Sequence, residues 1–437
     1  MLKRETECIN KTYPEAHIKN YMPPNLSDSL LPDKSPRKLE KALSLESCAS
    51  STEHCSCDEA SYGIGDAVFS CFVVAPHVVS VWRGTWGLME LKPQLFPFAQ
   101  IFLLGIVIHI CFAVVRTRLL SRSAGAWSNP GGGPVSYARE RVISRVYTYI
   151  FILSNIMHWR GGWGLLDMCV DAVLPDVEDP HRPILIAGIT LFCYLSITIL
   201  RASRNLLASP YFLVTDGKEP TYIFTTRFNI SNSRETMLYI LDCIFSVTVV
   251  GSLVVFVWRG SWALLDIFLF PDDKSKSCWT SLIAGYVVVI VTFALQAPVR
   301  WSAARLHGAP RLLLADVYHL VSFVATVNVW RGVWGLLDIY FFPETPKLSN
   351  WCSHIVSLTL LILLNCSNSV IVRGVYIDAE EPAGECVVFP CHYLRLFFHK
   401  ERTKKRHRRA LQAAAAAAAG RKPEDASLPL QMPEEKV

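Results

Sequence analysis

Residues 330–338 read Trp330-Arg331-Gly332-Val333-Trp334-Gly335-Leu336-Leu337-Asp338, and near-copies of this nine-residue motif occur at three earlier places in the chain. The earlier copies begin at Trp82, Trp159 and Trp258, so successive copies start 77, 99 and 72 residues apart. Eight of the twelve tryptophans lie in the four copies, which argues against a chance repeat. The spacing suits a pair of membrane-spanning helices with their loops. The repeat therefore predicts a membrane protein built from four similar units.

Composition supports the membrane class. Hydrophobic residues make up 51% and charged residues 18% of the 437-residue chain, and its mean hydropathy is +0.29. Residues 1–62 are polar and hold no apolar run behind a basic start, so we expect a disordered cytoplasmic arm without a cleavable signal peptide. We expect residues 63–373 to form the membrane domain and residues 374–437 to form a basic, partly disordered cytoplasmic tail.

The membrane domain contains eight apolar runs of about 17–22 residues, the length that crosses the hydrocarbon core of a bilayer. The runs cover residues 63–82, 97–115, 141–159, 183–200, 237–258, 279–298, 312–330 and 354–372. Each odd-numbered run ends at the first tryptophan of a motif copy, and each even-numbered run follows that copy. The sequence thus predicts an all-α integral membrane protein with eight transmembrane helices, arranged as four helix-motif-helix repeats.

The distribution of basic residues predicts the orientation, because short loops rich in Lys and Arg stay in the cytoplasm. Arginines follow each even-numbered run, whereas the loops beyond the motifs carry acidic residues such as Asp176 and Asp272. We therefore expect both termini in the cytoplasm and all four motifs at the outer face.

Within a motif copy, the two tryptophans are four residues apart and the arginine and the acidic residue are seven apart, so each pair shares a helix face. A continuous helix over residues 237–270 would be about 51 Å long, too long for a core of about 30 Å. We therefore expect each helix to break at the motif glycine and the tryptophans to anchor the chain at the membrane interface. The motif residues singled out are Trp82, Arg83, Glu90, Trp159, Arg160, Asp167, Trp258, Arg259, Asp266, Trp330, Arg331 and Asp338.

A second set of charged residues lies at the other end of the runs. Asp66 and Asp242 precede the first tryptophan of their copies by 16 residues, and Asp316 precedes its own by 14. A carboxylate in the hydrocarbon region is costly unless it is paired, so we expect ion pairs across the bundle. The candidates are Asp66, Asp242, Asp316, Arg145, Arg116, Arg201, Arg300 and Arg373.

Two interpretations of these charges remain open. Four copies around a common axis could line a polar cavity or an ion path. Arginine–carboxylate pairs at helix ends also serve only to fix register and rotation, and tryptophan with arginine is typical of a membrane anchor.

Catalytic motifs are missing from the sequence: it has no nucleophile with a base at recognisable spacing and no phosphate-binding glycine loop. We therefore expect neither an enzyme nor a cofactor, metal or nucleic-acid site. The cluster of Cys48, Cys55 and Cys57 with His54 is an incomplete zinc ligand set. Cys278 and Cys352 each lie beside a tryptophan after the third and fourth copies and could form a disulfide, with Cys169 as a competitor.

The tail carries a basic, partly amphipathic stretch at residues 393–409. Such a stretch just inside a membrane can bind anionic lipid or calmodulin, or it can act only as a topology anchor. We expect the lipid bilayer and anionic lipid to be its partners.

Four Trp-Arg-Gly-x-Trp-Gly/Ala-Leu-Leu/Met-Asp/Glu copies between paired helices resemble the fuseless family of multi-pass proteins of invertebrate neurons. The resemblance covers roughly residues 60–375, and this chain varies the motif at Glu90 and Ala263. It implies a presynaptic plasma-membrane protein that supports active-zone organisation and localises calcium channels. It carries over no catalytic or ligand site.

Two hypotheses of function follow. The first is a synaptic scaffold that acts through its tails and membrane surface on presynaptic calcium-channel complexes. The second is a transporter or channel that acts through the arginine and carboxylate positions of the repeat.

Overall fold

The computed structural model describes residues 63–128, 134–216, 226–228, 236–371, 384–391, 393–394 and 398, and in this part of the chain it is helical, with one isolated bridge between Leu213 and Cys391. The expected N-terminal arm and the basic stretch beyond residue 398 lie outside the described residues. The α-helices are α5 (Ala75–Glu90), α6 (Phe98–Ser128), α7 (Pro134–Val173), α8 (Arg182–Ile199), α9 (Thr236–Phe245), α10 (Ser252–Phe268), α11 (Lys274–Arg305), α12 (Ala309–Tyr340) and α13 (Pro346–Leu363). Short π-helices η1 (Ser70–Val74) and η3 (Ser246–Gly251) and 3-10 helices η2 (Ser203–Leu206), η4 (Ser367–Val370) and η5 (Glu385–Val387) complete the described elements.

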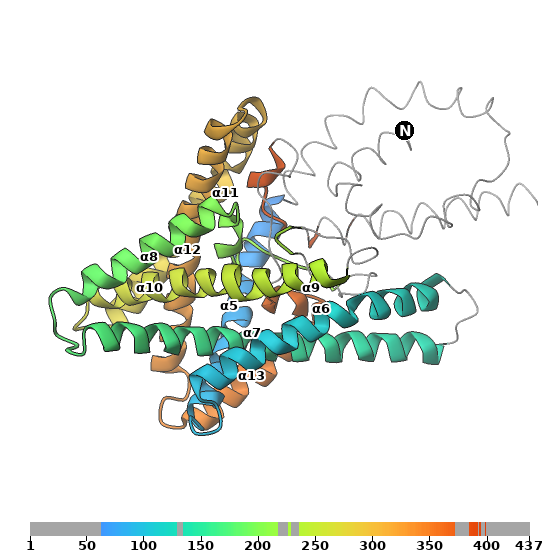
Figure 1. Ribbon diagram of the computed structural model, residues 1–437, viewed down its shortest axis with the longest axis horizontal. Coiled ribbons are helices and arrows are strands. Elements are labelled where there is room, and N and C mark those ends of the chain that lie inside the picture. The colour runs from blue at the N-terminus through green and yellow to red at the C-terminus, as the bar shows by residue number, and fades with distance from the viewer. Residues whose placement is uncertain are drawn as a thin grey trace, which may run out of the picture.

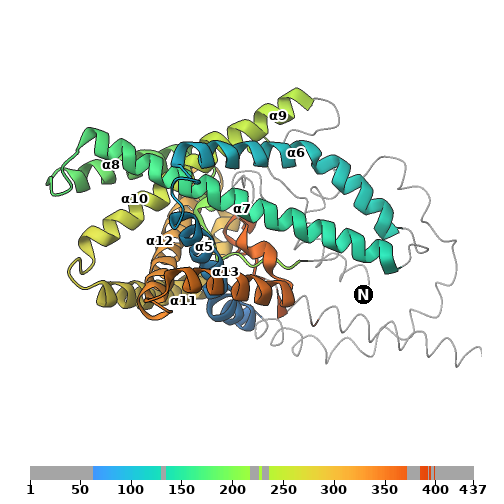
Figure 2. The ribbon, with the colours of Figure 1, turned by 90° about the horizontal axis from the view of Figure 1, so that it is seen from below.

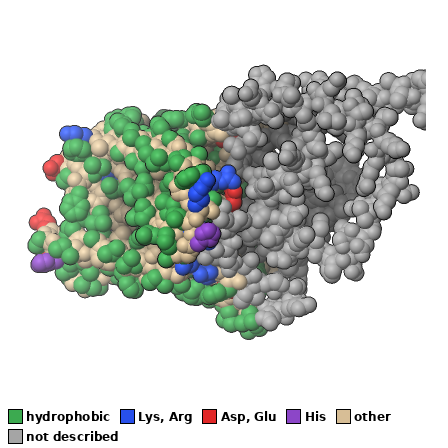
Figure 3. Space-filling model, turned by 90° about the horizontal axis from the view of Figure 1, so that it is seen from above, with side chains coloured by type: hydrophobic (Ala, Val, Ile, Leu, Met, Phe, Trp, Pro, Cys, Tyr) green, Lys and Arg blue, Asp and Glu red, His purple; other side chains and the backbone are tan. Residues whose placement is uncertain are grey.

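Among the described residues, six helical segments are long and apolar enough to cross a membrane. They are Gly63–Glu90, Phe98–Val115, Arg182–Ile199, Met237–Phe268, Lys274–Arg305 and Ala309–Tyr340. The other two expected spans fall on α7 and α13, which are helical but lie outside this group of six. Figure 3 shows hydrophobic side chains over most of the described face, with charged side chains at its margins. The all-α class and its membrane character are therefore confirmed for the described residues.

Each motif copy lies inside a continuous helix, so the expected break at the motif glycine is wrong. The four copies lie in α5, α7, α10 and α12, and these helices continue to the acidic residue of their copy or beyond it. We call the end of the bundle where these helices finish the motif end. A helix longer than the bilayer core can project from it as well as break, so its length does not require a break.

The helices pair in an order that the sequence did not predict. The motif helices α7 and α12 each pack mainly on the helix that precedes them in the chain, α6 and α11 respectively. The motif helix α10, which continues the helical segment begun by α9 and η3, packs mainly on α8. The first motif helix, α5, packs on the last long helix, α13. Figures 1 and 2 show α5, α7, α10 and α12 crossing near the middle of the molecule, with α6, α8, α11 and α13 outside them. The four units therefore form a closed ring in which the first copy completes the last.

The motif glycines allow this packing. A Cβ atom on Gly332 would lie 2.7 Å from the backbone nitrogen of Leu282 in α11, and one on Gly84 would lie 2.6 Å from the backbone nitrogen of His354 in α13. One on Gly161 would meet the backbone nitrogen of Phe102 in α6 at 2.7 Å. Backbone atoms cannot move aside as a flexible side chain can. The glycine of the motif is thus a close-contact residue between helices, as small residues are in membrane bundles.

We expect Gly332→Ala to destabilise the protein by about 1–3 kcal/mol, because the added methyl group overpacks a helix contact. Gly188 in α8 is the matched control, since a Cβ there meets nothing within 4 Å. Gly188→Ala should be neutral or stabilising, because alanine favours helix more than glycine does by about 1 kcal/mol. Thermal unfolding in detergent of the two variants measures both effects. Equal shifts would contradict the role given to Gly332.

Four tyrosine hydroxyl groups bridge neighbouring units of the ring. Three donate to backbone carbonyl groups of another helix, and the fourth, Tyr149, is 3.2 Å from Nε2 of His354. The three are Tyr194 to Asp316 at 3.4 Å, Tyr239 to Ala113 at 3.3 Å and Tyr286 to Cys71 at 2.9 Å. These contacts close the space between units that pack less tightly than the main helix pairs.

Some features of the repeat occur only in every second unit. The π-helices η1 and η3 both begin 12 residues before the first tryptophan of their copies, the first and the third. The 3-10 helices η2 and η4 follow α8 and α13, the second and fourth even-numbered runs, after residues of positive φ, Arg201 (56°) and Asn365 (54°). This alternation explains why Asp66 and Asp242 share a spacing that the other copies lack.

Candidate functional site

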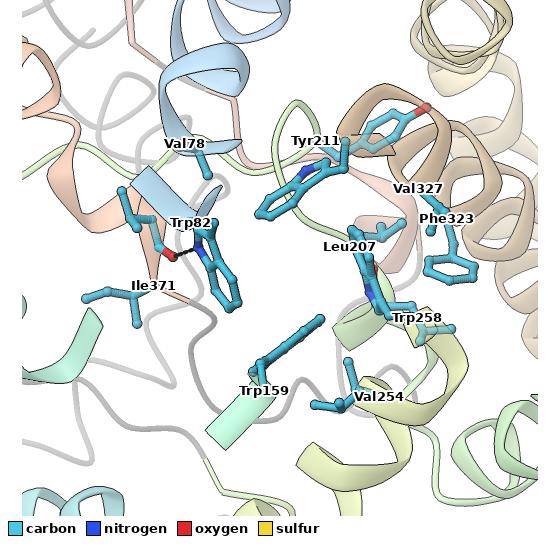
Figure 4. Packing of buried hydrophobic residues seen from close by; sticks show 14 of the residues in the cluster. Val78, Trp82, Trp159, Leu207, Tyr211, Val254, Trp258, Phe323, Val327 and Ile371 are labelled. Carbon is cyan, nitrogen blue, oxygen red and sulfur yellow. Dashed lines mark hydrogen bonds between the residues drawn. The ribbon is translucent and has the colours of Figure 1, made fainter. Parts of the chain in front are cut away.

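The first tryptophans of the four copies form a ring on the axis of the bundle, which we call the first tryptophan ring. Neighbouring ring centroids are 5.2 Å apart for Trp82–Trp159, 5.6 Å for Trp159–Trp258, 5.3 Å for Trp258–Trp330 and 5.7 Å for Trp330–Trp82, all in edge-to-face geometry. Figure 4 shows Trp82, Trp159 and Trp258 pointing toward one another from different helices. All four are buried. Edge-to-face contact is favourable because the positive edge of one ring meets the negative face of the next.

The second tryptophans form a parallel ring one helical turn nearer the motif end, the second tryptophan ring. Its centroid distances are 5.5 Å for Trp86–Trp163, 5.7 Å for Trp163–Trp262, 6.0 Å for Trp262–Trp334 and 5.8 Å for Trp334–Trp86. Its members are partly buried. The expected interfacial anchoring is therefore wrong for the first tryptophans, since packing four repeated helices around one axis places that position in the core.

The indole N–H groups of Trp82, Trp258 and Trp330 in the first tryptophan ring donate to backbone carbonyl groups. Trp82 donates to Val370 at 3.0 Å and Trp258 donates to Leu206 at 3.1 Å, and both acceptors are the last residue of a 3-10 helix, η4 or η2. Trp330 donates to Ser209 at 2.8 Å. These bonds satisfy buried donors and fix the segments after α8 and α13 against the axis.

The motif arginines pair between copies and not within them. Nε of Arg331 in the fourth copy lies 2.8 Å from Asp266 in the third. Nε of Arg259 in the third copy lies 2.6 Å from Asp167 in the second. The ring closes through Arg83 of the first copy, whose Nε lies 2.7 Å from Asp338 of the fourth. Each of these three arginines therefore binds the acid of the preceding copy.

Serine hydroxyl groups complete two of these sites. Arg331 donates through Nη1 to Ser281 and through Nη2 to Ser277, each at 2.7 Å. Arg83 donates in the same way to Ser353 and Ser349, each at 3.0 Å. Both side chains are 6% exposed. Their charge is thus satisfied by one carboxylate and two hydroxyl groups, as a buried guanidinium requires.

The second copy breaks this pattern. Arg160 is buried, donates from Nη1 to the carbonyl group of Phe96 at 3.0 Å and lies over the ring of Phe98 at 5.0 Å. Its Nε is buried without a hydrogen-bond partner. Glu90, the acid of the preceding copy, instead accepts from Nε1 of Trp86 at 2.7 Å. Among the described residues, three of the four contacts between neighbouring copies therefore contain a motif ion pair, and the contact between the first and second copies does not.

The aspartates of the second set accept hydrogen bonds from loop segments. Asp66 accepts from the backbone N–H of Tyr393 at 3.0 Å, and Asp242 accepts from Oγ1 of Thr226 at 2.6 Å. Oδ1 of Asp316 accepts from the hydroxyl of Ser203 at 2.7 Å. These carboxylates hold loop segments at the end opposite the motifs. Each of the three carboxylates thus stabilises a loop segment, and pairing across the bundle stays a prediction for them.

The arginines of that set have two partners that sequence reasoning missed. Arg145 pairs with Asp216, and Arg300 pairs with Glu385. Both acids lie in polar segments beyond α8 and α13, and neither has a repeated spacing that could have revealed it. Nη1 of Arg201 is buried without a hydrogen-bond partner. Arg373 and the side chain of Arg116 lie outside the described residues.

The cysteines are free in the described part of the chain, including Cys278 and Cys352, for which the sequence left a disulfide open. Cys278 is buried against Gly335 in the contact between α11 and α12, and Cys352 is partly buried. Helix packing buries Cys278 in the first turns of α11. Within the same residues, no group of three or more His, Cys, Asp or Glu side chains could hold a metal ion.

The fold and the site define a multi-pass helical membrane protein with a tryptophan-filled axis. The sequence model of the Fuseless family matches residues 61–371, which is more than half of the chain. The chain therefore belongs to the Fuseless family, as the motif predicted. No curated protein and no solved structure matches it.

Proposed function

We propose that the protein is a multi-pass plasma-membrane protein of neurons that supports synaptic transmission by organising the presynaptic active zone and localising calcium channels. Membership of the Fuseless family supports this proposal, because the resemblance to that family implies a presynaptic role. We assign it no catalytic role.

The contacts of the motif favour a scaffold over the alternative, a transporter or channel. A path along the axis would have to pass two tryptophan rings, the first of which is buried. The arginines and aspartates that could line such a path bind one another between neighbouring copies. These features are those of a rigid bundle that displays its ends to partners.

We further propose that all eight helices span the membrane, with the motif end outside and both termini in the cytoplasm. α7 and α13 take the same places in the ring as helices that are more apolar, which supports their spanning. An impermeant maleimide should label Asp272→Cys and not His307→Cys in intact cells, in a Cys169→Ser background. Labelling of His307→Cys from outside would reverse the topology.

Deletion of residues 393–409 tests the scaffold. In neurons that lack the protein, the wild-type chain should restore calcium-channel density at release sites, and the deletion should leave it at least twofold lower at equal surface expression. A basic stretch at the inner surface binds anionic lipid, so replacing its Lys and Arg by Gln should act like the deletion.

A different result would favour the alternative. Two results together would favour a transport function. The deletion variant would restore channel density fully, and Arg259→Lys combined with Asp167→Glu would abolish an ion or solute flux in proteoliposomes. These two residues form an ion pair, so the double variant preserves charge and changes only geometry.

A further inference from the structure

Residues 384–391 and 393–394, which we call the docked segment, lie against the end of the bundle opposite the motifs. The ring of Phe389 is buried among Tyr211, Phe293 and Tyr318, with centroid distances of 4.4, 5.3 and 5.3 Å. We call these three residues the aromatic socket. The expected boundary of the membrane domain at residue 373 leaves this segment in the tail, although Cys386, Val387 and Phe389 are part of the core.

The polar contacts of the docked segment go mainly to its backbone. Nη2 of Arg204 donates to the carbonyl group of Val388 at 2.8 Å, and Nε2 of His319 is 3.0 Å from that of Cys386. The N–H of Leu213 donates to the carbonyl group of Pro390 at 3.3 Å, beside a parallel bridge to Cys391. Backbone contacts of this kind recognise an extended peptide with little dependence on its sequence.

Side chains of the segment add contacts that depend on its sequence: Cys386 and Val387 are buried, and Sγ of Cys391 donates to the carbonyl group of Tyr211 at 3.2 Å. The aromatic and the acidic side chain make the most specific of these contacts. Phe389 fills the aromatic socket, and Glu385 pairs with Arg300. The side chains of Glu385 and Arg300 are 29% and 53% exposed, so this pair lies at the surface, where another carboxylate can replace Glu385. The pattern that the bundle recognises is therefore an acidic residue, Glu385, four positions before an aromatic residue, Phe389, on an extended backbone.

We propose that this end of the bundle is a peptide-binding site that the chain's own docked segment fills. The external ligand is a cytoplasmic segment of a partner protein with the same chemistry, an acidic residue four positions before a phenylalanine. The inference rests on the proposed function in two respects: this end of the bundle faces the cytoplasm, and the protein is a scaffold that binds partner proteins. Because the docked segment is tethered, its effective concentration is high and a partner must be concentrated at the same membrane to displace it.

The test uses the full chain in lipid nanodiscs and a fluorescent peptide of residues 383–394. Wild-type protein should bind the peptide weakly, because its site is filled. Phe389→Ala and Glu385→Arg should each bind it at least tenfold more tightly, because each weakens the docked segment. Phe268→Ala, which changes a phenylalanine that is 70% exposed on α10, is the control and should behave as wild type.

A charge swap identifies the site even if Phe389→Ala fails to fold. Combining Arg300→Glu with Glu385→Ala should abolish binding of the native peptide and allow binding of a peptide that carries Arg at the Glu385 position. Equal binding of the native peptide to wild type and to both opened variants would overturn the proposal, as would binding that is insensitive to Arg300.

The outcome is separable from that of the scaffold experiment. If the Glu385→Arg variant binds the peptide but calcium-channel localisation is unchanged, the peptide-binding site exists but does not act in channel localisation. Failure of peptide binding, with localisation still dependent on residues 393–409, would keep the scaffold and remove the site.

Discussion

Trp258→Ala is expected to destabilise the protein by about 3–5 kcal/mol, the cost typical of truncating a buried tryptophan to alanine. Trp258 is 2% exposed and contacts Trp159, Trp330 and Phe323 edge to face, at 5.6, 5.3 and 5.6 Å. It also donates to the carbonyl group of Leu206, so its loss leaves a buried acceptor unsatisfied. The midpoint of thermal unfolding in a mild detergent measures the effect.

Trp279→Ala is the matched control for this prediction. Trp279 is 47% exposed on α11 and lies in neither tryptophan ring. Its replacement should shift stability by less than about 1 kcal/mol, as surface changes usually do. If both variants lose the same stability, the first tryptophan ring is not the core of the fold.

The motif arginines are expected to differ in importance although the sequence repeats them equally. Arg331→Gln should cost about 1–3 kcal/mol. This is less than the usual cost of breaking a buried pair, because Asp266 is 51% exposed and water stabilises it after the loss. Arg160→Gln should cost less than about 1 kcal/mol, because it removes a buried charge that has no ion pair.

The same comparison tests the offset pairing. Asp266→Asn should reduce the effect of Arg331→Gln when the two are combined, whereas Asp338→Asn should not, since Asp338 binds Arg83. The pairing between copies would be contradicted if the changes in unfolding free energy of Arg331→Gln and Asp266→Asn were additive while those of Arg331→Gln and Asp338→Asn were coupled.

The sequence could predict the repeat, the helical class and the family, because these depend on spacing and composition. It could not predict which helices pair. The spacing of Arg331 and Asp338 is compatible with contact inside one copy, and only the packing of α12 on α11 shows that Arg331 reaches Asp266. Sequence reasoning also favoured neighbours in the chain and so missed the contact between α5 and α13.

The glycines and tryptophans were misread for a related reason. Tryptophan occurs both at the membrane interface and in the core of a membrane bundle, so the residue type does not distinguish the two places. Gly260 was read as a helix break, but it lies in α10 where a Cβ would meet the side chain of Thr190. Nothing in a single copy distinguishes these roles, because they arise only when the copies meet.

The closure of the ring has a consequence for biosynthesis. A ribosome delivers α5 first and α13 last, so Arg83 enters the membrane some 250 residues before Asp338, Ser349 and Ser353 exist to receive it. Until then the newly made chain holds an unmatched arginine and an open flank, a state that favours misassembly and calls for protection by membrane chaperones. Premature termination after the third copy would leave that state permanent.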